Sequence, residues 1–70
     1  MYFVGDIVEY QTTKVKYKNG SESGGVVKTG KISEAFHTVN KCPCYWIDGE
    51  KELILHNQIR RLINGAENYR

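Results

Sequence analysis

Two apolar segments in the last third of the chain flank the dipeptide Asp48-Gly49. Residues 45–47 read Tyr-Trp-Ile, and residues 53–55 read Leu-Ile-Leu. An Asp-Gly pair between two such segments is typical of a two-residue type I′ turn, in which both turn residues need a positive φ. The sequence therefore predicts a β-hairpin at this point and favours a small β-protein.

The side chains of a strand alternate between its two faces. Tyr45 and Ile47 are therefore expected to face the core, together with Leu53 and Leu55 from the second strand of the hairpin. Trp46 is expected to face outward, where an aromatic side chain is a candidate anchor for a homodimer interface or a partner groove. The alternative is that a loop covers Trp46.

Two further strands are expected in the first half of the chain, at residues 7–11 and 26–36. Gly30, inside the second of them, indicates a bulge or a sharp bend of the kind that curls a sheet into a barrel. Between the two strands, residues 14–18 alternate lysine with apolar side chains, and residues 19–25 contain only Asn, Gly, Ser and Glu. This pattern predicts a long, mobile, polar loop on a basic stem.

Near the C-terminus, Ile59 and Leu62 stand three residues apart, which favours one helical turn followed by a short edge strand. The polar residues 64–70 are expected to form a flexible tail. A chain of 70 residues has room for one small domain, which we place at residues 1–63.

Short strands, glycine-marked bends, one long early loop and a final hairpin followed by a helical turn resemble a small SH3-like barrel. The resemblance covers nearly the whole chain and rests on architecture, because the segments GDIV at residues 5–8 and IRRL at residues 59–62 occur in many unrelated barrels. The expected fold class is all-β, a small SH3-like barrel of about five short strands with one helical turn near the C-terminus. This architecture alone implies no particular function.

Three segments follow the order seen in MazF/PemK-type toxins, which are endoribonucleases on an SH3-like barrel. They are GDIV at residues 5–8, GSESGG at 20–25 and ILHNQIR at 54–60. In that family the glycine-rich loop leads into an Arg-Pro pair whose arginine serves catalysis, whereas this chain continues Val26-Val27-Lys28. The chain also lacks a nucleophile-base motif and a phosphate-binding glycine loop that opens a helix. We therefore expect a protein that is not an enzyme, with an endoribonuclease as the least favoured alternative.

Basic and aromatic residues recur along the chain and could form one face that binds nucleic acid. Lysines would hold phosphates, while Tyr10, Tyr17 or Trp46 would stack on unpaired bases. The net charge of +2 permits such a partner without demanding it. The candidate residues are Lys14, Lys16, Tyr17, Lys18, Lys28, Lys31, Arg60 and Arg61.

Nucleic-acid binding through this lysine-rich face is thus the first interpretation of the sequence. The alternative is a protein–protein interaction module that uses Trp46 and the long loop at residues 19–25. Small, plain modules of that kind resemble proteins encoded by phages or other mobile elements.

Cys42 and Cys44 are separated only by Pro43, so we expect them to be reduced thiols rather than a disulfide. With His37 and His56 they could surround a zinc ion, but structural zinc sites usually space their cysteines by two to four residues, and only one residue separates this pair. We therefore expect no metal and no cofactor. Without an apolar run of membrane-spanning or signal-peptide length, a cytoplasmic location is expected.

Overall fold

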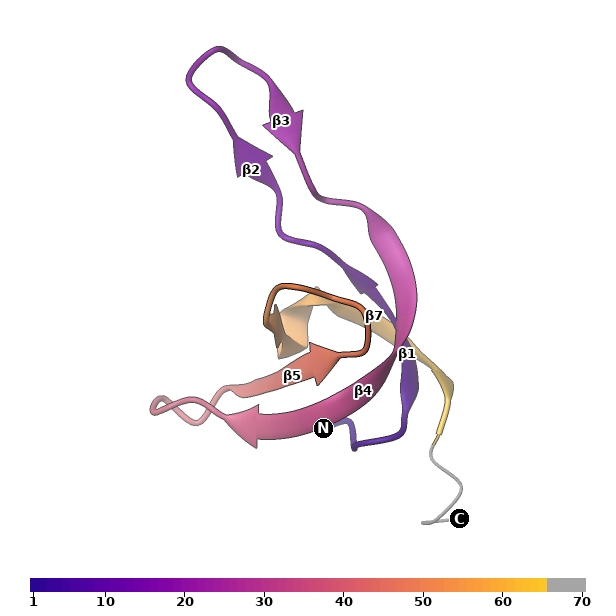
Figure 1. Cartoon of the computed structure of the whole chain (residues 1–70). Helices are drawn as coiled ribbons and strands as arrows, with labels where there is room; N and C mark the ends of the chain where they lie inside the picture. The colour runs from indigo at the N-terminus through magenta and orange to yellow at the C-terminus, as the bar shows by residue number, and fades with distance from the viewer. Residues whose placement is uncertain (66–70) are drawn as a thin grey trace.

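The structure is a computed structural model that describes residues 1–65. Five strands form one antiparallel sheet in the order β6-β5-β4-β1-β7, and β2 pairs with β3 in a separate small sheet (Figure 1). In this described part of the chain a single 3-10 turn, η1, joins β6 to β7. The elements are β1 (Ile7–Gln11), β2 (Val15–Lys16), β3 (Glu22–Ser23), β4 (Val27–His37), β5 (Pro43–Ile47), β6 (Ile54–Leu55), η1 (His56–Gln58) and β7 (Ile59–Asn64). The all-β prediction is confirmed, as is the first strand.

Strand β4 organises the sheet because it pairs with β1 along its first half and with β5 along its second half. The ribbon bends strongly between these halves (Figure 1), and the register shifts between Ile32 and Glu34. Of the two alternatives expected at Gly30, the bulge is not found at that residue, since Gly30 pairs in register with Val8, whereas the strand that contains it is bent (Figure 1). A Cβ at Gly30 would overlap the Cγ2 atom of Ile47, so glycine is needed there for close packing across the bend.

The two outer strands of the sheet, β6 and β7, do not pair with each other. Within residues 1–65 the sheet is therefore open and does not close into a hydrogen-bonded barrel. The connection explains this, because η1 takes up the chain between the two strands and β6 is only 2 residues long.

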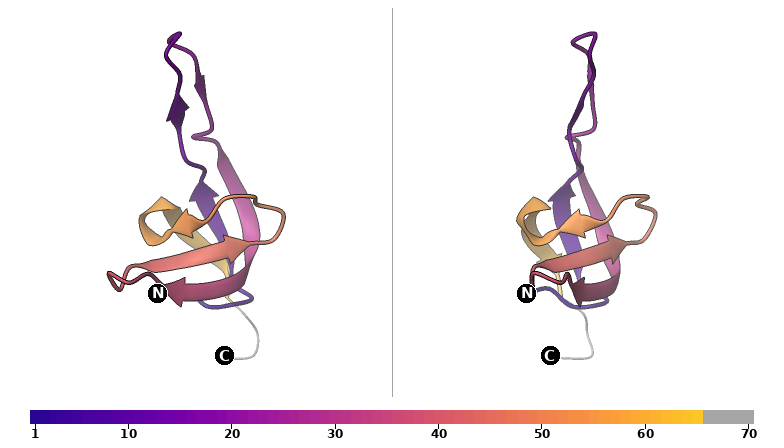
Figure 2. Two further views of the ribbon diagram at one scale, coloured as in Figure 1. Left: turned by 60° about the vertical axis from the view of Figure 1, so that its left-hand side comes forward. Right: turned by 90° about the vertical axis from the view of Figure 1, so that its left-hand side faces the viewer.

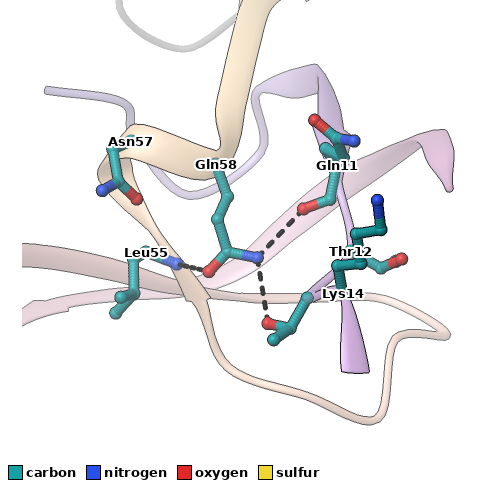
Figure 3. Close-up of a pocket in the computed structure, with 7 residues that line it drawn as sticks. Gln11, Thr12, Lys14, Leu55, Asn57 and Gln58 are labelled. Atoms are coloured by element: carbon teal, nitrogen blue, oxygen red, sulfur yellow. Dashed lines mark hydrogen bonds between the residues drawn. The ribbon is translucent and has the colours of Figure 1, made fainter. Parts of the chain in front are cut away.

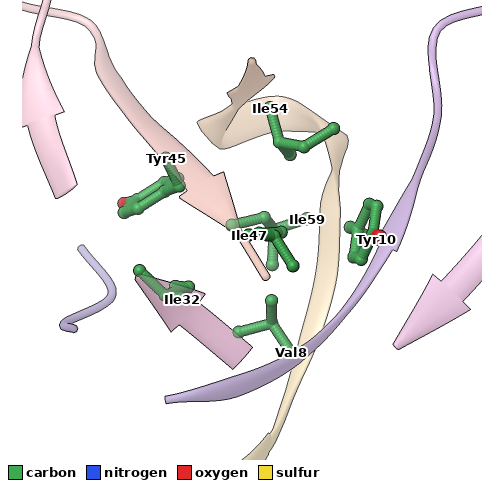
Figure 4. Packing of buried hydrophobic residues seen from close by; sticks show 7 residues of the cluster. All are labelled: Val8, Tyr10, Ile32, Tyr45, Ile47, Ile54 and Ile59. Carbon is green, nitrogen blue, oxygen red and sulfur yellow. The ribbon is translucent and has the colours of Figure 1, made fainter. Parts of the chain in front are cut away.

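The hydrophobic core lies inside the curved sheet, where side chains from five strands converge (Figure 4). Tyr45 and Ile47 are buried and Trp46 is 37% exposed, as their alternation predicts. The core consists of Val8, Tyr10, Ile32, Tyr45, Ile47, Ile54 and Ile59.

Leu53 and Leu55 do not join this core, contrary to the sequence prediction. Ile54 is fully buried and Leu55 is 42% exposed. The turn also differs from the prediction: within residues 1–65 Lys41 is the only residue other than glycine with a positive φ, so Asp48-Gly49 is not a type I′ turn. The amide of Glu50 donates to the carbonyl of Ile47 at 2.9 Å and Gly49 has a φ of +81°, a combination typical of a type II turn.

The chain after this turn runs as a loop over residues 48–53 before β6 begins. In the observed register Tyr45 pairs with Ile54, which places Ile54 on the inner face of the sheet. A two-residue turn would pair Ile47 with Glu50 and Tyr45 with Glu52, so it too would put Ile54, and neither leucine, on the inner face. The expectation for the leucines failed because it did not follow this parity across the turn.

The helical turn is also displaced from its expected position. It occupies His56–Gln58, and the segment with Ile59 and Leu62 is strand β7. Asn64, expected in the tail, pairs with Ile7 as the last residue of β7, and residues 66–70 of that tail lie outside the described part of the chain. None of the helical structure in residues 1–65 is long and apolar enough to cross a membrane.

Candidate functional site

A two-stranded hairpin, residues 14–23, projects from the sheet, and we call it the arm (Figures 1 and 2). It contains β2, β3 and the turn between them. At its tip the amide of Gly20 donates to the carbonyl of Tyr17 at 3.0 Å, and Asn19 Oδ1 accepts from the amide of Ser21 at 3.0 Å. The segment expected to be a loop at residues 19–25 therefore includes a tight turn and a strand.

The arm joins the sheet through a narrow neck, residues 11–13 and 24–26. Gly24 and Gly25 have φ values of +78° and +68°, which residues other than glycine rarely adopt. A Cβ at Gly24 would overlap the carbonyl oxygen of Thr13, whereas a Cβ at Gly25 would meet Lys14 at an ordinary 3.5 Å. The two strands of the neck thus come so close at Gly24 that only glycine fits.

Hydrogen bonds from other elements fix the neck in place (Figure 3). Gln58 of η1 donates from Nε2 to the carbonyl of Gln11 at 2.9 Å and to Thr13 Oγ1 at 3.3 Å. The amide of Leu55 donates to Gln58 Oε1 at 3.0 Å, which orients the glutamine. Glu52 Oε1 accepts from the amide of Thr13 at 2.7 Å. The direction of the arm is therefore set by η1 and by the loop at residues 48–53.

That loop is itself tied to the core by Glu50. The hydroxyl of Tyr10 donates to Glu50 Oε1 at 2.8 Å, and Lys28 Nζ approaches the same oxygen at 3.4 Å. Burial and this hydrogen bond raise the pKa of Tyr10 to about 12. The hydrogen bond from Tyr10 holds the pKa of Glu50 below its usual value. Tyr10 is buried, so it cannot stack on a base as the sequence suggested, and Lys28 is engaged with a carboxylate.

The arm has one charged face, formed by Lys14, Lys16 and Glu22, which we call the lysine face. Lys16 lies directly opposite Glu22, so their side chains share this face. Lys14 Nζ forms an ion pair with Glu22 Oε2 at 3.1 Å. Lys16, and Lys18 at the tip, are exposed and make no ion pair within residues 1–65. Three lysines against one glutamate give the arm an excess of positive charge.

The opposite face of the arm is formed by Val15, Tyr17 and Ser23, and we call it the tyrosine face. Val15 lies directly opposite Ser23 in the ladder. The hydroxyl groups of Tyr17 and Ser23 lie 3.1 Å apart and share a hydrogen bond. Val15 is 44% exposed and Tyr17 is 51% exposed, so this face presents apolar surface to solvent.

The remaining basic candidates lie away from the arm. Arg61 Nε donates to Glu9 Oε2 at 2.8 Å, and Arg60 Nε lies 3.4 Å from Glu9 Oε1. The hydrogen bond from Arg61 lowers the pKa of Glu9. Lys31 pairs with Ile7, at the end of β1 remote from the neck. The structure thus separates the eight candidates into an arm group and a sheet group.

Trp46 belongs to an exposed apolar patch on the outer face of β4, β5 and β6. Cys44, two residues before it, is buried and lies directly opposite both Phe36 and Leu55. Phe36 is 38% exposed and Leu55 is 42% exposed. We call Phe36, Cys44, Trp46 and Leu55 the outer patch. The sequence prediction missed Phe36 and Leu55 because the register of β4 and β6 was not known.

Two pockets flank the ridge formed by Leu55 and Asn57. One has a volume of about 460 Å³ and lies between the neck and η1 (Figure 3). The other, of about 220 Å³, lies on the far side of the ridge and is largely apolar. The first is lined by Gln11, Thr12, Thr13, Lys14, Leu55, Asn57 and Gln58. The second is lined by Cys42, Pro43, Leu55, His56 and Asn57. No sequence motif indicated either pocket.

The two cysteines differ in burial, because Cys44 lies within β5 and Cys42 precedes the strand. Cys42 is exposed and Cys44 is buried, and both are free. His56 Nδ1 lies 3.1 Å from the hydroxyl of Tyr45 and so has a structural partner. Within residues 1–65, no three His, Cys, Asp or Glu side chains gather in a way that could hold a metal ion.

Comparison with protein-family models, with curated proteins and with solved structures found no match. The function of the chain must therefore be argued from the arm, the outer patch and the pockets themselves.

Proposed function

We propose that the protein binds nucleic acid through the arm. The observation that carries the proposal is a projecting hairpin with excess positive charge, on which Lys16 and Lys18 are exposed without an ion pair in the described chain. Lysines that contact phosphates release condensed counterions, and this release supplies much of the affinity of such proteins. A projecting element also reaches a partner without steric hindrance from the sheet.

The anchoring of the neck supports the same proposal. Gln58 and Glu52 hold the neck through hydrogen bonds, so the arm leaves the sheet in a defined direction. A binding element that is already held in place loses less conformational entropy when it meets its partner. The sheet and η1 then serve as the rigid support of the site.

We further propose that this support is an SH3-like fold. The support for this proposal is a five-stranded antiparallel sheet in the order β7-β1-β4-β5-β6, a long hairpin between β1 and β4, and a 3-10 turn between β6 and β7. In this view the arm is an elaborated first loop of the fold, and the open edge between β6 and β7 is filled by η1.

An NMR titration tests the proposed function on the complete protein. Labelled protein is mixed with pools of single-stranded and double-stranded oligonucleotides, of both RNA and DNA, at low and then at physiological salt. We expect amide shifts at residues 14–23 that weaken as salt is added. No shift in any pool at low salt would refute the proposal, and cleavage of the RNA would instead favour the endoribonuclease alternative.

The outer patch favours a second candidate function, protein–protein interaction. Phe36, Trp46 and Leu55 expose large apolar side chains on three neighbouring strands, with Phe36 and Leu55 on either side of Cys44 and Trp46 opposite Glu34, and aromatic side chains in such patches commonly anchor protein interfaces. Sedimentation of the wild type and of the Trp46→Ala variant tests whether a second copy of the chain is this partner. A dimer that Trp46→Ala disrupts without unfolding the protein would support it, and a monomer at all concentrations would exclude self-association.

A further inference from the structure

We infer that the arm binds in the major groove of double-stranded B-form DNA. This inference rests on the proposed function and names the class of nucleic acid that the arm fits. It follows from the dimensions of the arm, from its single exposed aromatic ring and from the chemistry of its two faces.

The dimensions of the arm match the groove. Neighbouring strands lie about 4.8 Å apart, so a two-stranded ribbon with its side chains is roughly 10 Å across. The B-form major groove is about 12 Å wide and about 8.5 Å deep and admits such a ribbon. Residues 14–18, at about 3.3 Å per residue, extend roughly 16 Å from the neck, so the ribbon is long enough to lie in the groove clear of the sheet. The deep, narrow major groove of A-form RNA excludes a ribbon of this width.

The aromatic residues argue against a single-stranded partner. Proteins that bind single strands stack successive bases on several aromatic rings along one groove. Of the three aromatic candidates from the sequence, Tyr10 is buried and Trp46 lies in the outer patch on β5, which leaves Tyr17 alone on the arm. One ring on a hydrogen-bonded hairpin provides no path for consecutive bases.

The two faces of the arm suit the floor and the rims of the groove. The hydroxyls of Tyr17 and Ser23 can donate to or accept from base edges, and Val15 can contact the methyl group of thymine. With the tyrosine face toward the floor, the long side chains of Lys16 and Lys18 extend toward the rims, where the phosphates lie. The ion pair with Lys14 compensates the charge of Glu22, so that this carboxylate repels the phosphates less.

Fluorescence anisotropy with three probes of one sequence tests this inference on the full chain. The probes are a DNA duplex of about 16 base pairs, one of its strands, and the corresponding RNA duplex, all at the same low salt concentration. We expect the DNA duplex to bind at least tenfold more tightly than either of the others. Equal or tighter binding of the single strand or of the RNA duplex would overturn the inference while leaving nucleic-acid binding intact. Binding to none of the three would refute the proposed function itself.

A fourth probe separates the two grooves of the duplex. In this DNA the cytosines carry bulky substituents at the 5 position, which fill the major groove and leave the minor groove unchanged. We expect a loss of affinity of tenfold or more for this probe. Unchanged affinity would show that the arm does not enter the major groove and would overturn the inference.

Two matched variants locate the contact on the arm. Tyr17→Phe removes the hydroxyl from the tyrosine face and is expected to weaken binding to the DNA duplex at least threefold. Lys41→Gln is the control, because Lys41 is an exposed lysine in the turn between β4 and β5, remote from the arm. Equal affinity of wild type and Tyr17→Phe would remove the tyrosine face from the interface, since the backbone of the arm is expected to be the same in both.

Discussion

The close approach at the neck makes Gly24 the most sensitive position in the arm, and its neighbour Gly25 provides a matched control. Both residues have a positive φ, so replacing either with alanine costs about 1–2 kcal/mol of backbone strain. Only Gly24→Ala adds a side-chain atom that overlaps the carbonyl of Thr13. Overpacking of this kind typically costs about 1–3 kcal/mol, so the total strain in Gly24→Ala is about 2–5 kcal/mol.

The protein can relieve this strain by opening the arm, because within residues 1–65 β2 and β3 pair only with each other. We therefore expect the amide signals of residues 14–23 to shift or broaden in Gly24→Ala, while signals of β1, β4 and β5 stay in place. In Gly25→Ala the arm signals are expected to remain close to those of the wild type. Affinity for duplex DNA is expected to fall in Gly24→Ala and to change little in Gly25→Ala.

Two-dimensional amide spectra and thermal unfolding of both variants provide the assay. If the two spectra and the two DNA affinities coincide, the close contact at Gly24 does not hold the arm in place. A complete loss of the folded spectrum in Gly24→Ala would equally contradict the reasoning, because it would mean that the sheet depends on the arm.

Three further predictions concern the sheet. In Tyr10→Phe the lost hydrogen bond to Glu50 should lower the free energy of unfolding by about 1 kcal/mol, measured by urea titration. The pKa of Tyr10 is raised from 10.0 to about 12, so its contribution to the free energy of unfolding should be fully present below pH 10 and should be lost as the pH rises toward 12. The decline in stability over this range should be smaller in Tyr10→Phe. Gly30→Ala should lower stability by about 1–3 kcal/mol through overlap in the core, and an unchanged urea midpoint would contradict this. Glu9→Gln removes the ion pairs of Arg60 and Arg61 and should leave the salt dependence of DNA binding unchanged, because both arginines lie away from the arm. A steeper salt dependence would place these arginines in the binding site.

Local patterns in the sequence were sufficient where a strand is regular. The alternation at residues 45–47 correctly assigned the inward and outward faces of β5, and the apolar spacing at residues 7–11 located β1. The pattern failed at Asp48-Gly49, because the same dipeptide suits both a type I′ turn and the type II geometry that a longer loop uses. The loop length depends on long-range bonds from Glu50 and Glu52, which the local sequence does not reveal.

The sequence named the basic residues of the candidate site but did not indicate which of them lie together in the structure. The lysines of the arm are exposed, as a face that binds phosphates requires. The prediction of one continuous basic face did not anticipate that Glu9 engages Arg60 and Arg61 across strands, or that Glu50 engages Lys28. These partners lie far apart in sequence, so only the register of the sheet brings them together. The same holds for the outer patch, in which β4, β5 and β6 each contribute side chains.

The salt dependence of duplex DNA binding tests the central claim most directly. It is measured for the wild type, for the double variant Lys16→Gln/Lys18→Gln and for the control Lys41→Gln. Each lost phosphate contact lowers the slope of log affinity against log salt by about 0.9, so the double variant should lose about 1.8 and the control should match the wild type. An unchanged slope in the double variant would contradict the assignment of nucleic-acid binding to the arm.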